Sequence, residues 1–79
     1  MKTLDTYNKI FCTHFRKKVE ELPGLKYRGI PLWDSIGHMD LIAILEEEFD
    51  IHMETPDVPA FVSYEKGKEI LAKYGVTIE

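Results

Sequence analysis

The sequence predicts an all-α fold, a small four-helix bundle with three main helices, a short third helix and a long first loop. Apolar residues recur at spacings of three and four along two stretches, which is the period of an amphipathic helix. No segment alternates apolar and polar residues long enough to indicate a strand. With 79 residues, residues 1–79 are expected to form one domain around one core.

The first expected helix is marked by apolar residues on one face, and Thr3 or Asp5 can cap its start. Arg16 is expected near its end, and Pro23 with Gly24 is expected to stop it. The apolar positions are Leu4, Tyr7, Phe11, Phe15 and Val19.

A connection from Glu21 to Trp33 follows, and its prolines and glycines exclude a continuous helix. It is apolar enough to pack across the helices rather than form a flexible linker. The residues expected to pack are Leu22, Leu25, Ile30, Leu32 and Trp33.

The second expected helix begins at Asp34 and Ser35 and runs to about Phe49. A turn of about 100° per residue places one set of side chains toward the core and another set away from it. The core set is His38, Leu41, Ile42, Leu45 and Phe49. The opposite set is Ile36, Asp40, Ala43, Ile44 and Glu47, with Gly37 and Glu48 beside it.

Beyond Ile51 the helical pattern weakens, because Pro56 and Pro59 limit any helix there to a short turn at residues 58–61. Ser63 is the expected N-cap of a last helix that ends at Gly75. Its apolar face is Tyr64, Ile70 or Leu71, and Tyr74.

Charge is segregated along the chain, whose formal net charge is -4. No Lys or Arg lies between Gly29 and Glu65, whereas nine acidic residues lie from Asp34 to Glu65. The cations of the first third are too few and too well balanced for a nucleic-acid partner, so a basic protein is the expected partner. One cysteine, no secretion signal and no membrane-length apolar run predict a soluble cytoplasmic protein that does not bind membranes.

Asp34 and Ser35 admit two interpretations. Either residue before an apolar run is first of all a helix cap. Alternatively, the Ser35 hydroxyl accepts a phosphodiester, because the positive end of a helix favours an anion. Gly37 costs roughly 1 kcal/mol relative to Ala in a helix, and a bare surface there would let a partner approach Ser35. The helix dipole disfavours the negative charges of Glu46, Glu47, Glu48 and Asp50 at the end of this helix. A charge run is in general a solvated, solubilising face, but these charges sit where local stability disfavours them, so they are interpreted as part of an acidic docking surface.

The stretch WDSIGHMDLIAILEEEFDI, residues 33–51, resembles the attachment region of acyl carrier proteins. Asp34 and Ser35 match the Asp-Ser motif of that family, Ile36 takes its usual Leu position, and residues 45–49 match its acidic helix. The resemblance extends through Phe61 and Ser63 into the last helix, whereas the first helix agrees only in pattern. Gly37, His38 and Trp33 depart from the fatty-acid carriers, and no Gly-Gly precedes the serine as in many peptidyl carriers.

The resemblance implies that Ser35 carries 4'-phosphopantetheine, whose thiol holds an acyl or aminoacyl group as a thioester. It implies a phosphopantetheinyl transferase using coenzyme A, a loading enzyme and a downstream synthase or transferase as partners. The chain itself is then not an enzyme and holds no metal. It is expected to act as a monomer in a dedicated biosynthetic pathway, and the identity of the carried group stays open. The positions matching the partner-binding surface are Asp34, Ile36, Asp40, Ile44, Glu47 and Glu48.

Other functions remain as alternatives. The chain could be an acidic helical interaction module in which Ser35 is only a cap, or a degenerate carrier that is never modified. A metal-dependent or hydrolytic enzyme is less favoured, because Cys12 and His14 point apart on a helix and the histidines lack ligand spacing. His38 is expected to be packed and hydrogen-bonded, and Trp33 is expected to anchor the loop on the core.

Overall fold

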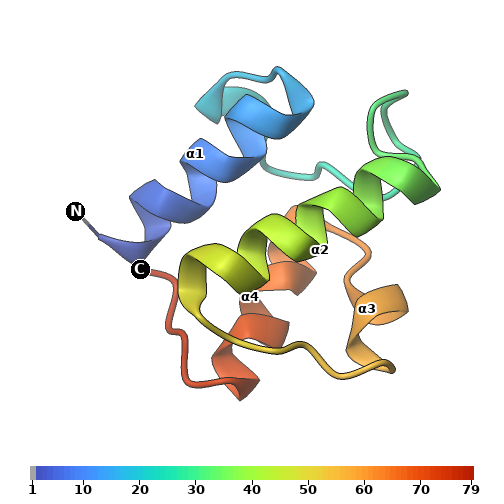
Figure 1. The fold of residues 1–79 in the computed structure, drawn as a ribbon. Coiled ribbons are helices and arrows are strands. Elements are labelled where there is room, and N and C mark those ends of the chain that lie inside the picture. Colours follow the sequence, from blue (N-terminus) through green and yellow to red (C-terminus); the bar gives the residue numbers. More distant parts are fainter. Residues whose placement is uncertain (1) are drawn as a thin grey trace.

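The structure, a computed structural model, describes residues 2–79 and contains four α-helices and one 3-10 helix (Figure 1). Within residues 2–79 there is no strand, only an isolated bridge between Lys26 and Ser63. A helical domain with a long first connection and a short third helix was predicted, and this is confirmed. The elements are α1 (Thr3–Phe15), η1 (Val19–Glu21), α2 (Ser35–Phe49), α3 (Asp57–Ala60) and α4 (Tyr64–Lys73).

Helix α1 lies beside α2 and runs in the opposite direction (Figure 1). Its buried residues, Tyr7, Phe11 and Phe15, are those that the spacing predicted, while Leu4 is half-buried. At the start, the Asp5 carboxylate accepts a hydrogen bond from the Lys2 backbone N–H at 3.3 Å, so Asp5 rather than Thr3 provides a cap.

The expected extension of the first helix to Val19 is wrong. The chain leaves the helix at Arg16, which adopts a left-handed conformation with φ 56°, and the Lys17 N–H bonds back to the Cys12 carbonyl at 3.1 Å. Val19 therefore falls in η1 and is 55% exposed. The helix stops well before Pro23 and Gly24, because the early turn satisfies its last carbonyls.

The long connection between α1 and α2 is anchored on the core, as predicted. Leu22 and Trp33 are fully buried and Leu25 is nearly so. Leu32 is an exception, because it is 45% exposed and faces away from the core. Three buried apolar side chains therefore fix the path of the connection, and one apolar side chain stays at the surface.

Phe11 lies at the centre of an aromatic core. The centroid of its ring is 4.8 Å from that of Tyr7 and 5.3 Å from that of Tyr64. The ring of Trp33 lies 5.7 Å away and that of Phe61 6.4 Å away. Because these rings come from α1, the long connection and the C-terminal third, aromatic packing joins these three parts of the chain.

Gly67 explains how α4 fits against this core. A Cβ atom at this position would lie 2.2 Å from Phe61 Cζ and 2.3 Å from the Tyr7 hydroxyl. The Tyr7 hydroxyl passes over the helix to donate a hydrogen bond to the Tyr64 carbonyl at 2.7 Å. Burial raises the pKa of the Tyr7 phenol, so the hydroxyl stays a donor there.

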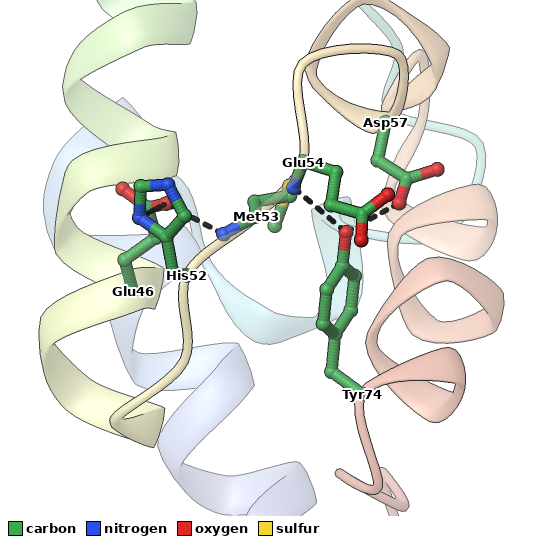
Figure 2. Close-up of polar contacts among 6 residues, drawn as sticks. All are labelled: Glu46, His52, Met53, Glu54, Asp57 and Tyr74. Carbon is green, nitrogen blue, oxygen red and sulfur yellow. Dashed lines mark hydrogen bonds and ion pairs between the residues drawn. The ribbon is translucent and has the colours of Figure 1, made fainter.

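Polar side chains hold the segment between α2 and α4 (Figure 2). The Glu46 carboxylate accepts a hydrogen bond from the Met53 N–H at 2.7 Å and lies 3.7 Å from the His52 ring. Glu46 is half-buried and bonded here, so its interpretation as part of a free docking surface is wrong. The negative charge of Glu46 near the end of α2 is therefore offset by its hydrogen bond to the segment that follows.

Asp57 joins α3 to the end of α4. Its carboxylate accepts a hydrogen bond from the Lys73 ammonium at 2.6 Å. It also accepts one from the Tyr74 hydroxyl, which Figure 2 shows. The Tyr74 hydroxyl in turn accepts the Glu54 N–H at 2.8 Å. The hydrogen bonds from Lys73 and Tyr74 hold the pKa of Asp57 below its usual value.

Acid is expected to weaken this attachment of α3. Because the pKa of Asp57 is lowered on folding, its contribution to stability is present above the unfolded value of about 3.9 and is lost as pH falls through the folded pKa. The difference in unfolding free energy between wild type and Asp57→Asn should be constant from neutral pH to about pH 5 and shrink below about pH 4. Urea denaturation at a series of pH values measures this. A difference that grows on acidification would contradict the assignment.

Candidate functional site

Ser35 is the first residue of α2, and its side chain is exposed. The helix is capped by Asp34, whose carboxylate accepts the Gly37 N–H at 2.8 Å. Within residues 2–79 the Ser35 hydroxyl makes no hydrogen bond. The sequence left both residues as candidate caps, and the structure assigns that role to Asp34.

The first turn of α2 also offers backbone donors. The N–H groups of Ser35 and Ile36 have no hydrogen-bond partner in the described part of the chain, whereas the next N–H, of Gly37, is taken by Asp34. Free N–H groups and the positive end of the helix dipole favour an anion beside the Ser35 hydroxyl.

Gly37 is required by the chain's own loop. A Cβ atom at Gly37 would lie 2.0 Å from the Leu32 carbonyl oxygen, which is backbone and cannot easily move. The Gly37 carbonyl also accepts a hydrogen bond from the His14 ring of α1 at 2.9 Å. The interpretation of Gly37 as a bare surface for a partner is therefore wrong, because the loop already occupies that space.

The exposed face of α2 carries the residues that the sequence singled out. Ile36 is 73% exposed and Ile44 38% exposed, and the acidic residues Asp40, Glu47 and Glu48 are exposed as well. On the opposite face His38, Leu41, Ile42 and Leu45 are buried and Phe49 is half-buried, as predicted.

Four of the six predicted partner-binding residues fall into two groups along the chain, and the other two, Asp40 and Glu47, are exposed on α2. Asp34 and Ile36 lie in the first turn or directly before it, next to Ser35. Ile44 and Glu48 instead line a groove of about 440 Å³ between α2 and α1, opposite Lys9 and Arg16. The candidate surface therefore extends from the start of α2 toward α1.

Two apolar residues near Ser35 were missed. Met39 is 56% exposed and follows Ser35 by four residues, so the two side chains share a helix face. Leu32 is 45% exposed in the loop before Ser35. The spacing of Met39 was a signal available in the sequence, whereas the exposure of Leu32 follows from the path of the loop.

A hollow of about 260 Å³ lies beside Ser35, between the long connection, α2 and α3. We call it the Ser35 hollow. Its lining is largely apolar and consists of Tyr27, Ser35, His38, Met39, Val58 and Pro59.

His38 forms the inner side of this hollow and is 8% exposed. Its Nδ1 accepts the indole N–H of Trp33 at 3.0 Å, and its Nε2 lies 2.7 Å from the Val58 carbonyl oxygen. An indole N–H only donates and a carbonyl only accepts, so the imidazole is neutral with its proton on Nε2. The predictions of a packed, hydrogen-bonded His38 and of Trp33 as loop anchor are confirmed.

The side chain of Arg28 places a positive charge near the start of α2. The guanidinium of Arg28 lies 5.4 Å from the centre of the Tyr27 ring, and Tyr27 lines the Ser35 hollow. Hydrogen bonding to Tyr27, with the charge of Asp34 adding to it, raises the pKa of Arg28. This side of the site therefore carries positive charge as well as the acidic residues of α2.

Of the side chains weighed for enzymatic chemistry, His14 contacts the first turn of α2, His38 lines the Ser35 hollow, and Cys12 lies in α1. Burial, assisted by Glu20 and Glu21, raises the pKa of the Cys12 thiol, which disfavours the thiolate. No cluster of three metal-ligating side chains occurs among residues 2–79. In the same range no helix is long and apolar enough to cross a membrane.

Comparisons with protein-family models, with curated proteins and with solved structures find no match for this chain.

The division of roles between Asp34 and Ser35 can be tested by stability. Asp34→Ala should lower the unfolding free energy by about 1 kcal/mol, because the Gly37 N–H loses its cap. Ser35→Ala should change it by less than about 0.5 kcal/mol, because the hydroxyl has no partner in the fold. Urea denaturation of both variants and wild type measures this. A larger loss for Ser35→Ala than for Asp34→Ala would assign the cap to the serine.

Proposed function

We propose that the chain is an acyl carrier protein, a carrier-type helical bundle that holds an acyl or aminoacyl group on 4'-phosphopantetheine attached to Ser35. It presents this group as a thioester to biosynthetic enzymes and catalyses no reaction itself. The proposal includes a monomer acting in the cytoplasm. It has its basis in the resemblance of residues 33–51 to the attachment region of that family.

The observation that carries the proposal is the unused hydroxyl of Ser35 at the start of a helix that Asp34 already caps. In the attachment step this oxygen forms a bond to the phosphorus of coenzyme A that bears the pantetheine. The bond from that phosphorus to the rest of the pyrophosphate breaks, adenosine 3',5'-bisphosphate leaves, and the hydroxyl proton passes to a base of the transferase. The serine is therefore the acceptor in a reaction that another protein performs.

The surroundings of Ser35 fit a phosphodiester and a flexible arm. The free N–H groups of Ser35 and Ile36 suit the phosphate, and the apolar hollow beside Ser35 suits the less polar part of the arm. When attached, the arm supplies a thiol that forms the thioester. The chain's part is to hold the arm at the end of α2 and so raise the effective concentration of the cargo at each partner's active site.

The exposed face of α2 is the proposed docking surface for the transferase, the loading enzyme and the downstream synthase or transferase. Its acidic residues would attract basic partners at long range, and the apolar side chains would make the close contacts. The residues are Asp34, Ile36, Asp40, Ile44, Glu47 and Glu48, with Leu32 and Met39 added because they are exposed near Ser35.

The attachment itself is tested by mass. Incubation of the protein with coenzyme A and a promiscuous phosphopantetheinyl transferase should add one phosphopantetheine group, measured by intact mass spectrometry. Ser35→Ala should abolish the gain, whereas Ser63→Ala, which removes the serine that caps α4, should retain it. No gain in wild type, or a gain that survives Ser35→Ala, would overturn the carrier function. Binding of basic proteins without any modification would then favour an interaction module.

The docking surface is tested by charge reversal. Asp40→Lys combined with Glu47→Lys should slow modification of Ser35 by about tenfold or more at low salt, because the attraction that brings a basic transferase to α2 is removed. The effect should shrink at about 1 M salt, where the screening length falls to about 3 Å. The control is Glu20→Lys with Glu69→Lys, which changes the net charge equally at exposed sites outside α2. Equal slowing by both pairs would show that only the net charge matters.

A further inference from the structure

The Ser35 hollow has one buried polar side chain in its lining. Of the other lining residues, Ser35, Met39 and Pro59 are exposed and Tyr27 and Val58 are half-buried, whereas His38 sits next to the aromatic core. The ring of His38 lies 6.3 Å from that of Trp33 and 6.3 Å from that of Phe61, both fully buried. A group that entered from the hollow would have to displace the imidazole to reach the core.

The imidazole is fixed from two directions. Trp33, at the end of the long connection, donates to Nδ1, and the Val58 carbonyl in α3 accepts from Nε2. The ring of Tyr27, 5.1 Å away, covers it from a third side. Displacing His38 would leave the indole N–H and the Val58 carbonyl without partners in a region of low polarity, which is unfavourable.

We propose that His38 is the specificity-determining residue of this carrier, because it closes the floor of the Ser35 hollow and keeps the cargo at the surface. This inference rests on the proposed attachment at Ser35. The hollow of about 260 Å³ is partly open to solvent, so the end of the arm or a group placed there stays outside the core. The class of cargo that follows is short or polar acyl and aminoacyl groups, since a long alkyl chain finds no apolar interior to enter.

The direct test compares a short and a long cargo on the wild-type protein. The acetyl and octanoyl forms are made by a phosphopantetheinyl transferase that transfers the acylated arm from acetyl- or octanoyl-coenzyme A to Ser35. Each product is verified by intact mass. Each thioester is cleaved with hydroxylamine, and each rate is divided by that of the same acyl group on free pantetheine. Both ratios should be close to one, and the Trp33 indole N–H signal in a 1H–15N spectrum should be the same in the two forms.

Protection of the octanoyl thioester by about tenfold or more in wild type, equivalent to about 1.4 kcal/mol, would overturn the proposal. A shift of the Trp33 indole signal in the octanoyl form alone would also overturn it, because the chain would then have reached the floor of the hollow.

Two variants test whether His38 is the residue responsible. His38→Ala removes the floor, and Trp33→Phe removes the indole donor but keeps an aromatic ring in the core. Octanoyl but not acetyl thioesters should become protected in at least one of them. His52→Ala, which changes a histidine whose side chain is 95% exposed, should behave as wild type. If neither folded variant protects the octanoyl form, His38 is not the determinant. If both variants are unfolded by circular dichroism, the wild-type comparison decides the proposal alone.

The failure of this inference is distinguishable from the failure of the proposed function. No mass gain at Ser35 refutes the carrier function and removes the basis of the inference with it. A normal mass gain followed by protection of the octanoyl group in wild type refutes only the role of His38.

Discussion

The pair of hydrogen bonds made by the His38 ring is the interaction on which the arrangement around Ser35 depends. It joins Trp33, where the long connection ends, to Val58 in the short helix α3, and His38 itself belongs to α2. These three segments come together within one turn of Ser35. The second attachment of α3, through Asp57 to Lys73 and Tyr74, ties it to the end of α4.

Each polar group near Ser35 has its own structural role. Asp34 stabilises the helix start and so leaves the neighbouring hydroxyl unused, while Gly37 lets the Leu32 carbonyl lie against the first turn of α2. His14 ties α1 to the same turn. The start of α2 is therefore held rigidly from the loop and from α1, although the Ser35 side chain is exposed. Such a base beside the exposed Ser35 hydroxyl would suit the proposed flexible arm, because the reach of the arm would then be set by the arm alone.

The sequence predicted the elements that depend on local signals. The bounds of α2 and the start of α4 follow from the caps Asp34 and Ser63 and from apolar spacing, and the buried and exposed faces of α2 follow from its period. The end of α4 lies at Lys73, two residues before the predicted stop at Gly75. The prediction failed where no glycine or proline marks a turn, or where a contact beyond the helix decides. The left-handed turn at Arg16 ends α1 early without a glycine or proline, and Glu46 is taken up by the backbone of Met53, seven residues later. The candidate site could be located from Ser35 and from the resemblance of residues 33–51 to an attachment region. The hollow beside Ser35 could not be predicted, since three separate segments line it.

Trp33 is the chain's single tryptophan, and it is buried with its indole N–H bonded to His38. The tryptophan fluorescence of the protein therefore has one source, which lies under the start of α2. Indole emission is sensitive to a neighbouring imidazole in hydrogen-bond contact. The protein thus contains a built-in optical probe of the region around Ser35. Movements of the loop or of α3 relative to α2 can be followed in real time without attaching any label.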